Sequence, residues 1–310
     1  MHEHIARAMY YLGVHLLYAS IVGSAAWGLT SILRASATTK YWIWVVTAFN
    51  FVLPSGALID KLWAPHLTWA RPLGAIGGPV WVMTEGLTAV VLGIIWMTGA
   101  FSMLSRLILR TRKERRPAQA LAPLSDHGRI ANFLSDGIPV SIGDGHPSPA
   151  VRGVLHPYIL LPAGIDQLLN QREFRAVLIH EVAHAKRRDN LIRLLYEASL
   201  SVLWFHPLMW LAGARIGLYR ELSCDEAVIR RSHGQDLVSA LAKLAVPEQG
   251  GVLQATASSH LNYRLARLAG PPQTTYCAAS LLLTSLFAAF IVAGTFQTIA
   301  HTACCFVLKR

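Results

Sequence analysis

Charged residues are scarce in this chain of 310 residues. Asp, Glu, Lys and Arg make up 15% of the sequence, hydrophobic residues make up 53%, and the mean hydropathy is +0.40. Soluble globular domains average about 25% charged residues. The shortage excludes an ordinary soluble protein, and the composition indicates a membrane protein.

Acidic residues are the scarcer of the two charge types, with 17 Asp and Glu against 28 Lys and Arg and a formal net charge of +11. Such an excess fits either a nucleic-acid-binding face or membrane topology, and the placement of the basic residues decides between them. Of the 28 Lys and Arg residues, 21 lie within 106–276, beginning with RLILRTRKERR directly after a hydrophobic run. This clustering favours topology and attraction to anionic lipid, so we expect a lipid bilayer as a partner and no direct binding of nucleic acid.

Cysteine is also rare. The four cysteines show no C-x-x-C spacing, and they are Cys224, Cys277, Cys304 and Cys305. Neither a disulfide scaffold nor a cysteine zinc site is therefore predicted. Cys224 is expected to be a small buried residue, and no flanking motif assigns lipidation or redox chemistry to Cys304 and Cys305.

Long hydrophobic runs, in contrast, are abundant. A helix needs about 20 apolar residues to cross the hydrocarbon of a bilayer. The first run has no small-residue cleavage site and is predicted to be a retained span, and the second opens with YWIW, aromatic residues suited to a membrane interface. Four runs meet or approach the required length: 8–33, 41–60, 78–105 and 277–300.

The basic region between the third and fourth runs sets the predicted topology. The positive-inside rule places it in the cytoplasm and both chain termini outside. The chain thus divides into a membrane region with three spans at 1–105, a cytoplasmic domain at 106–276, and a fourth span with a short tail at 277–310. A further apolar run at 191–214 contains a glutamate and a His-Pro pair, so the sequence leaves open whether it enters the membrane.

Residues 151–162 read VRGVLHPYILLP and predict one or two strands bounded by Pro157 and Pro162. Because proline has no N–H to donate to a neighbouring strand, the prolines favour a position at the edge of a sheet.

Residues 177–190 read VLIHEVAHAKRRDN and contain an H-E-x-x-H pattern. The apolar residues around it recur at helical spacing, so His180 and His184 lie one turn apart on one face, where both imidazoles can bind one tetrahedral zinc ion. Glu181 is turned by about 100° from the histidines and can act as a base toward a metal-activated water without ligating the metal. The pattern alone also occurs by chance, and a catalytic site needs a third ligand.

The segment YRELSCDEAVIRR has helical periodicity and offers that ligand in Glu221. Asp225 follows one turn later on the same face, where it can hold a ligand histidine by its second ring nitrogen. The alternative for Asp225 is an ordinary helix-capping or salt-bridge role beside Arg220. Two helices, one with H-E-x-x-H and one with E-x-x-x-D, form a coherent catalytic zinc site.

Asp189 and His206 are weaker candidates. Asp189 fits a helix cap or a salt bridge with Arg187 or Arg188 as well as it fits support of a ligand histidine. His206 precedes a proline in an apolar run, so a structural or interfacial position competes with a role in binding substrate or an oxyanion.

The segments SPAVRGVLHPYILLPAGI, REFRAVLIHEVAHAKRRDN, WFHPLMWLA and RELSCDEAV occur in this order between hydrophobic runs. Together they resemble the BlaR/MecR-type membrane zinc metallopeptidases, the beta-lactam sensor-transducer peptidases, most strongly over residues 148–230. The resemblance implies zinc bound by His180, His184 and Glu221, with Glu181 as catalytic base. Members of that family continue into an extracellular penicillin-binding domain, whereas this sequence ends at Arg310, so antibiotic sensing cannot be carried over from the resemblance.

The predicted fold is a mainly α membrane protein with four transmembrane helices and a cytoplasmic zincin-like (gluzincin) α+β metallopeptidase domain. The predicted function is regulatory cleavage of a protein or peptide substrate, with a transcriptional repressor as one candidate, at a bacterial-type inner membrane. A homodimer is left open. Two alternatives remain: a housekeeping membrane protease of the CAAX-prenyl-protease or HtpX type, and a non-catalytic transducer with a structural zinc site.

Overall fold

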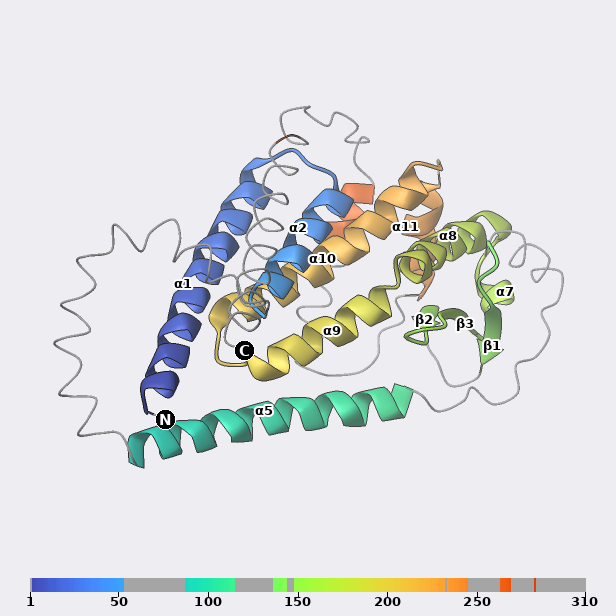
Figure 1. Cartoon of the computed structure of the whole chain (residues 1–310). Coiled ribbons are helices and arrows are strands. Elements are labelled where there is room, and N and C mark those ends of the chain that lie inside the picture. The colour runs from blue at the N-terminus through green and yellow to red at the C-terminus, as the bar shows by residue number, and fades with distance from the viewer. Residues whose placement is uncertain are drawn as a thin grey trace.

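Figure 1 shows the computed structural model of the chain. The structure describes residues 2–52, 87–114, 136–143, 148–231, 233–244, 263–268 and 282. The elements in chain order are α1 (His2–Ile32), α2 (Ala37–Asn50), α5 (Leu87–Glu114), β1 (Val140–Gly143), β2 (Ala150–Arg152), β3 (Tyr158–Pro162), α7 (Ile165–Leu168), α8 (Gln171–Arg187), α9 (Asp189–Val202), α10 (Pro207–Ile229) and α11 (Gly234–Leu244). The described part of the chain is therefore mainly helical with one small sheet, as predicted.

Helix α8 confirms the helix predicted around the H-E-x-x-H pattern, and both of its ends are defined by local structure. Asn170 accepts hydrogen bonds from the N–H groups of Arg172 and Glu173, and the Glu173 side chain accepts one from the N–H of Asn170, which forms a capping box. At the other end Arg188 has a φ of 56° in the left-handed region. This residue turns the chain directly from α8 into α9 and places Asp189 beside the last turn of α8.

The sheet has the strand order β1-β3-β2, with β3 parallel to β1 and antiparallel to β2. The edge position predicted for the proline-bounded segment is wrong for β3, which is the central strand. Pro157 precedes β3 and Pro162 is its last residue, so neither proline removes a donor from the middle of the ladder. Strand β2 forms an edge instead.

One hydrophobic core lies between the sheet and helices α8 and α11. The sheet contributes Ile159 and Leu161 of β3 to this core. The helices contribute Phe174 and Val177 of α8 and Leu237 of α11. All five are nearly inaccessible to solvent, so α8 is anchored along the face opposite its exposed charges.

A second core joins α2 to α9 and α10, and includes Tyr41, Trp44, Tyr196, Met209 and Leu222. Tyr41 and Trp44 have 0% of their surface exposed, so the interfacial position expected for the aromatic residues of YWIW is wrong for these two. They are buried because α2 packs directly against α10. This core crosses the predicted boundary between 1–105 and 106–276, and the division at those residues stays a prediction.

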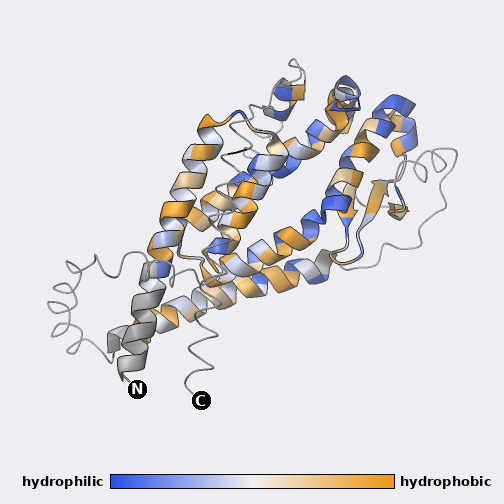
Figure 2. Cartoon of the chain, turned by 45° about the horizontal axis from the view of Figure 1, so that its top comes forward, coloured by the Kyte–Doolittle hydropathy of each residue, from blue (hydrophilic) through white to orange (hydrophobic). Residues whose placement is uncertain are grey.

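Among the described residues one helix, Val90–Arg112 within α5, is long and apolar enough to cross a bilayer, and only 6% of its apolar window is buried. Hydrophobic segments recur along α1 and α5 in Figure 2. Helix α5 continues past the predicted span end at 105, to Glu114. Helix α2 has 14 residues and measures about 21 Å, which is less than the thickness of the hydrocarbon layer. The predicted span at 277–300 lies outside the described residues except for 282, so four spans remain a prediction.

The apolar run at 191–214 is not one helix. Helix α9 ends at Val202, and α10 begins at Pro207 after a short connection. His206 caps α10 with extended backbone, and proline at the first position suits a helix start. A single membrane span over 191–214 is therefore excluded, because the chain changes helix within it.

Candidate metal centre

Two histidines of α8 converge on one position. The Nε2 atoms of His180 and His184 lie 3.2 Å apart, and both side chains are largely buried. The convergence follows from their spacing of four residues on a regular helix. The sequence prediction that the two imidazoles share a face is confirmed.

Glu221 of α10 lies opposite the histidines. Its Oε2 atom is 3.6 Å from the Nε2 of His180 and 3.8 Å from the Nε2 of His184. Ligand atoms at about 2.0–2.1 Å from a tetrahedral zinc ion lie about 3.4 Å from one another. The three observed separations bracket that value, so the donor set fits one zinc ion with a fourth position left for substrate or water.

Each histidine has a carboxylate next to its other ring nitrogen. Asp189 Oδ2 lies 2.6 Å from the Nδ1 of His184, and Asp225 Oδ1 lies 3.2 Å from the Nδ1 of His180. A carboxylate in this position fixes the orientation and tautomer of a ligand imidazole. The structure thus brings both predicted supporting residues to the places where they can hold the histidines.

The buried charges shift the pKa values of the donors. Burial alone would lower the pKa of His180, but hydrogen bonding to Asp225 and Glu221 outweighs it and raises the pKa to about 9. Burial would raise the pKa of Glu221, but the charge of His184, hydrogen bonding to both histidines and the charge of Arg220 hold it well below its usual range. The metal-free centre therefore pairs an ionised carboxylate with a protonated imidazole.

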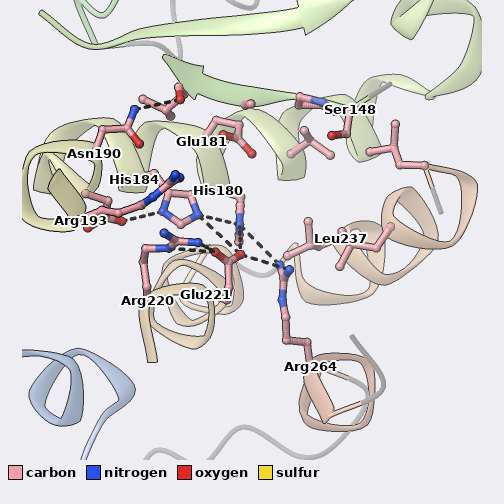
Figure 3. Close-up of a pocket in the computed structure, with 17 residues that line it drawn as sticks. Ser148, His180, Glu181, His184, Asn190, Arg193, Arg220, Glu221, Leu237 and Arg264 are labelled. Carbon is pink, nitrogen blue, oxygen red and sulfur yellow. Dashed lines mark hydrogen bonds and ion pairs between the residues drawn. The ribbon is translucent and has the colours of Figure 1, made fainter. Parts of the chain in front are cut away.

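The donor residues His180, His184 and Glu221 line a cavity of about 420 Å³ between β2, α8, α9, α10 and α11. Glu181 lines it from α8, and Figure 3 shows its carboxylate on the β2 side of the two histidines. Within the described ranges no hydrogen bond or ion pair involves this carboxylate. Glu181 is therefore placed beside the donor triangle without belonging to it, as a base requires.

Two arginines lie at the centre. The sequence indicated Arg220 as a salt-bridge partner for Asp225, but the structure pairs it with Glu221, and Arg264 had no sequence signal. Arg220 donates to Oε1 of Glu221 over 2.9 and 3.1 Å. Arg264, in the helical segment 263–268, lies 3.2 Å from Oε2 of Glu221 and donates to both oxygens of Asp225 over 2.8 and 2.9 Å. Arg264 belongs to no motif and approaches the centre only through tertiary folding, so sequence reasoning missed it.

A second group of potential metal ligands lies next to Arg187, at the end of α8. His184, Asp189 and Cys224 also lie close enough together to hold a metal. The guanidinium of Arg187, however, donates to both oxygens of Asp189 over 2.6 Å and lies 3.3 Å from the sulfur of Cys224. The cation that balances this group is therefore Arg187, and Cys224 is a buried residue beside it, as expected.

His206 lies apart from these residues. It precedes α10, and its Nε2 is 3.1 Å from the hydroxyl of Ser20 while its ring packs on Phe51. It is not among the residues that line the cavity. Glu221 follows 15 residues later, about 22 Å along the helix axis, so this position gives no support to a role in binding substrate or an oxyanion.

The sequence matches the family described as BlaR1 peptidase M56 over residues 10–268. It is 40% identical over 83 residues to the regulatory protein BlaR1 of Bacillus licheniformis, which covers 27% of this chain and 14% of that protein. It is 23% identical over 154 residues to the methicillin resistance mecR1 protein of Staphylococcus aureus, which covers 47% of this chain and 26% of that protein. Less than a third of either relative is therefore matched. Because the family match includes most of the chain, with both the H-E-x-x-H and the E-x-x-x-D segments, the chain belongs to the BlaR1 peptidase M56 family.

Proposed function

We propose that this chain is a membrane-bound zinc metalloendopeptidase that cleaves a protein substrate in a signalling role. The observation that carries the proposal is the group formed by His180, His184 and Glu221, whose donor atoms lie within 4.8 Å of one another, beside Glu181 in one cavity. Membership of a peptidase family supports the reaction. The regulatory role is supported by similarity to a protein named a regulatory protein.

His180, His184 and Glu221 would hold the zinc ion. When bound, zinc supplies Lewis-acid activation of water and of the peptide carbonyl. Asp189 accepts a hydrogen bond from the Nδ1 of His184, and Asp225 lies 3.2 Å from the Nδ1 of His180. In these positions the two carboxylates would keep the Nε2 atoms of the histidines turned toward Glu221. Arg220 holds the Oε1 atom of Glu221, which leaves Oε2 directed toward the histidines.

Glu181 would act as the general base and acid. Its carboxylate takes a proton from the attacking water and returns it to the nitrogen of the leaving amine. The residue is nearly buried, so bulk water competes little for the carboxylate. Glu181 lies on the same helix as His180 and His184, so the helix geometry would fix the distance of its carboxylate from the bond that is cleaved.

The substrate would bind as an extended strand along the edge of β2. Residues 148–151 line the cavity from this side, and an exposed strand edge offers backbone groups for pairing with a peptide. The side chain of Asn190 donates to the carbonyl oxygens of Val151 and Gly153 over 3.0 Å. Asn190 therefore occupies the far part of the edge and confines pairing to the part next to Glu181.

The other walls of the cavity suggest which side chains are accepted. Val177, Leu237, Leu241 and Leu244 form an apolar wall. An apolar side chain beside the scissile bond would lose water on binding and gain free energy there. We propose a substrate with a large apolar residue next to the cleaved bond.

The cavity would open to the cytoplasm, because the basic residues of 106–276 favour that side of a bacterial-type inner membrane. The substrate is then a cytoplasmic or membrane protein, with a transcriptional repressor as one candidate.

The test compares the wild type with Glu181→Gln and His184→Ala in full-length protein, for zinc content and for cleavage of a co-expressed candidate substrate. Glu181→Gln keeps the size of the side chain and removes the base, so zinc should remain while hydrolysis falls about 10²-fold or more. His184→Ala should lose both. Glu197→Gln, a change on α9 outside the cavity, serves as the matched control and should behave as wild type.

The alternative of a non-catalytic transducer predicts a different result. Its output in the cell should survive Glu181→Gln and fail only when metal loss disturbs the fold. Full cellular output together with full zinc content in Glu181→Gln would therefore rule out the peptidase.

A further inference from the structure

Tyr41 of α2 reaches the metal centre from outside the cavity. Its side chain is completely buried, and its hydroxyl donates to Oδ1 of Asp189 over 3.0 Å. The guanidinium of Arg187 lies over its ring, 4.4 Å from the centroid. Tyr41 is 148 residues away from Asp189 in the sequence, so only the packing of α2 on the other helices creates this contact.

Asp189 connects Tyr41 to a proposed zinc ligand. Its Oδ2 lies 2.6 Å from the Nδ1 of His184, whereas its Oδ1 accepts from Tyr41 and from Nε of Arg187. Arg187 balances the charge of the carboxylate, but it also belongs to α8, the helix that carries His184. Arg187 is itself held to α10, where it donates to the carbonyl of Arg220. Among the described residues, Tyr41 is the direct contact of this carboxylate that comes from outside α8 and α9.

Helix α2 is held at a second point, which fixes Tyr41 in place. The N–H of Ala37, at the first turn of α2, donates to Oε1 of Glu226 on α10 over 2.9 Å. Arg267 donates to the same oxygen over 2.6 Å. Because α2 is also packed in the core shared with α10, the hydroxyl of Tyr41 has little freedom to follow Asp189 if the carboxylate turns.

We propose that Tyr41 is a positioning residue of the metal centre, which holds Asp189 and, through it, the imidazole of His184 in the orientation that binds zinc. The inference rests on the proposed function, since it assumes zinc at His180, His184 and Glu221. Under this proposal, α2 contributes a positioning residue to the metal centre. Without the hydroxyl, the carboxylate keeps Arg187 and His184 but loses its anchor outside this pair.

The first measurement is the zinc affinity of purified full-length protein in detergent, determined by competition with a chelator. Tyr41→Phe keeps the ring against Arg187 and removes only the hydroxyl. Its zinc affinity should fall about 3- to 10-fold, less than the roughly 10- to 100-fold expected when a carboxylate that directly supports a ligand is lost.

Tyr196→Phe is the matched control. Tyr196 belongs to the same core, and its hydroxyl donates over 2.7 Å to the carbonyl of Met209, away from the cavity. Both variants lose one buried hydroxyl hydrogen bond, and phenylalanine fills the same space in each. Their unfolding temperatures should be similar, and only Tyr41→Phe should lose zinc affinity.

A double-mutant cycle tests the route through Asp189. Asp189→Asn should weaken zinc binding by about 10- to 100-fold, and adding Tyr41→Phe to it should cause no further loss, because coupled residues are not additive. The absorption spectrum of the cobalt-substituted protein reports the same geometry and should change in Tyr41→Phe but not in Tyr196→Phe.

The outcomes separate the two proposals. A wild-type protein that binds no zinc at this site refutes the proposed function. A wild type that binds zinc, with Tyr41→Phe within twofold of it, overturns only the role of Tyr41. An equal loss of zinc affinity in Tyr41→Phe and Tyr196→Phe also overturns that role, since the effect would then come from losing any buried hydroxyl. So does a full additional loss when Tyr41→Phe is added to Asp189→Asn, since the effect would then not pass through Asp189.

Discussion

At the scale of single residues, the metal centre repeats one arrangement twice. The Nδ1 of His184 contacts the carboxylate of Asp189, which forms an ion pair with Arg187. In the same way, the Nδ1 of His180 contacts the carboxylate of Asp225, which forms an ion pair with Arg264. A buried carboxylate needs a partner of opposite charge, because unpaired charge is costly in a low-dielectric interior. The arginines meet this need and leave the aspartates in place to orient the histidines.

The donor set predicts how zinc content responds to substitution. Glu221→Ala removes one of three ligands and should nearly abolish zinc binding, whereas Asp225→Ala should weaken it by roughly 10- to 100-fold. The metal content of purified protein and chelator competition measure the two effects. Glu197→Ala, which removes a carboxylate of α9 outside the cavity, is the control. Full zinc retention in Glu221→Ala would show that the third ligand is a different residue.

The raised pKa of His180 predicts a dependence on pH. Since this pKa is about 9 in the metal-free centre, the imidazole carries a proton at neutral pH that must leave before zinc binds. The pKa of His184 is raised as well. Zinc affinity should therefore fall as pH decreases below about 9, by at least about tenfold per unit between roughly pH 6.5 and 8.5, and level off only where both imidazoles have lost their protons.

Chelator competition across this pH range measures the slope. Asp225→Asn removes a carboxylate that raises the pKa of His180, so its affinity should level off at a lower pH than that of the wild type. An affinity that does not change with pH contradicts the pKa assigned to His180.

At the scale of elements, interactions at the first turn of α8 fix the position of this helix. The capping box at Asn170 begins the helix, and Glu173 also accepts from Lys243 of α11 over 2.7 Å. One carboxylate thus starts the helix and ties it to α11. Because His180 and His184 lie on the following turns, the start of α8 determines where the ligands sit relative to α10.

The cap predicts a moderate effect on stability. Asn170→Ala leaves the N–H groups of Arg172 and Glu173 without their acceptor, so the protein should lose about 1 kcal/mol of stability. The shift in the thermal unfolding midpoint of zinc-loaded protein measures it. Asn170→Asp keeps an acceptor at the same position and should stay close to wild type; an equal loss in both variants would show that the cap is not the cause.

At the scale of the whole molecule, the first two helices and the helices of the candidate metal centre form one packed unit. The core between α2, α9 and α10 contains large side chains from both parts of the sequence, and α5 carries the exposed apolar surface. Trp96 of α5 donates to the carbonyl of Val202 at the end of α9. The candidate membrane span is thus in direct contact with the helix that begins at Asp189.

The distribution of basic residues predicts the orientation of this unit. A reporter fused after Arg116 should be active in the cytoplasm and one fused after Arg310 should be active outside, because the Lys and Arg residues of 106–276 favour the inner side. Paired reporters that are active on opposite sides of the membrane measure both positions. If both fusions read as cytoplasmic, an even number of crossings separates them, and the proposed topology with a single crossing between Arg116 and Arg310 is wrong.

The sequence by itself determined the local part of the centre. Two histidines four residues apart on a helix must share a face, and the same rule places Asp225 with Glu221. The helix around the H-E-x-x-H pattern also followed from its periodicity, since side-chain direction along a helix depends only on the number of residues between two positions.

Only the tertiary structure decided which distant groups meet at that centre. No motif links Tyr41 or Arg264 to the centre, and they reach Asp189 and Asp225 through the packing of separate helices. The central place of β3 was missed because prolines at the two ends of a strand do not reveal how many neighbours it has. Spacing in the sequence predicts contacts within one element, whereas contacts between elements depend on which buried surfaces fit together, and for α2 the apolar surface that suggested a membrane interface fits against α10.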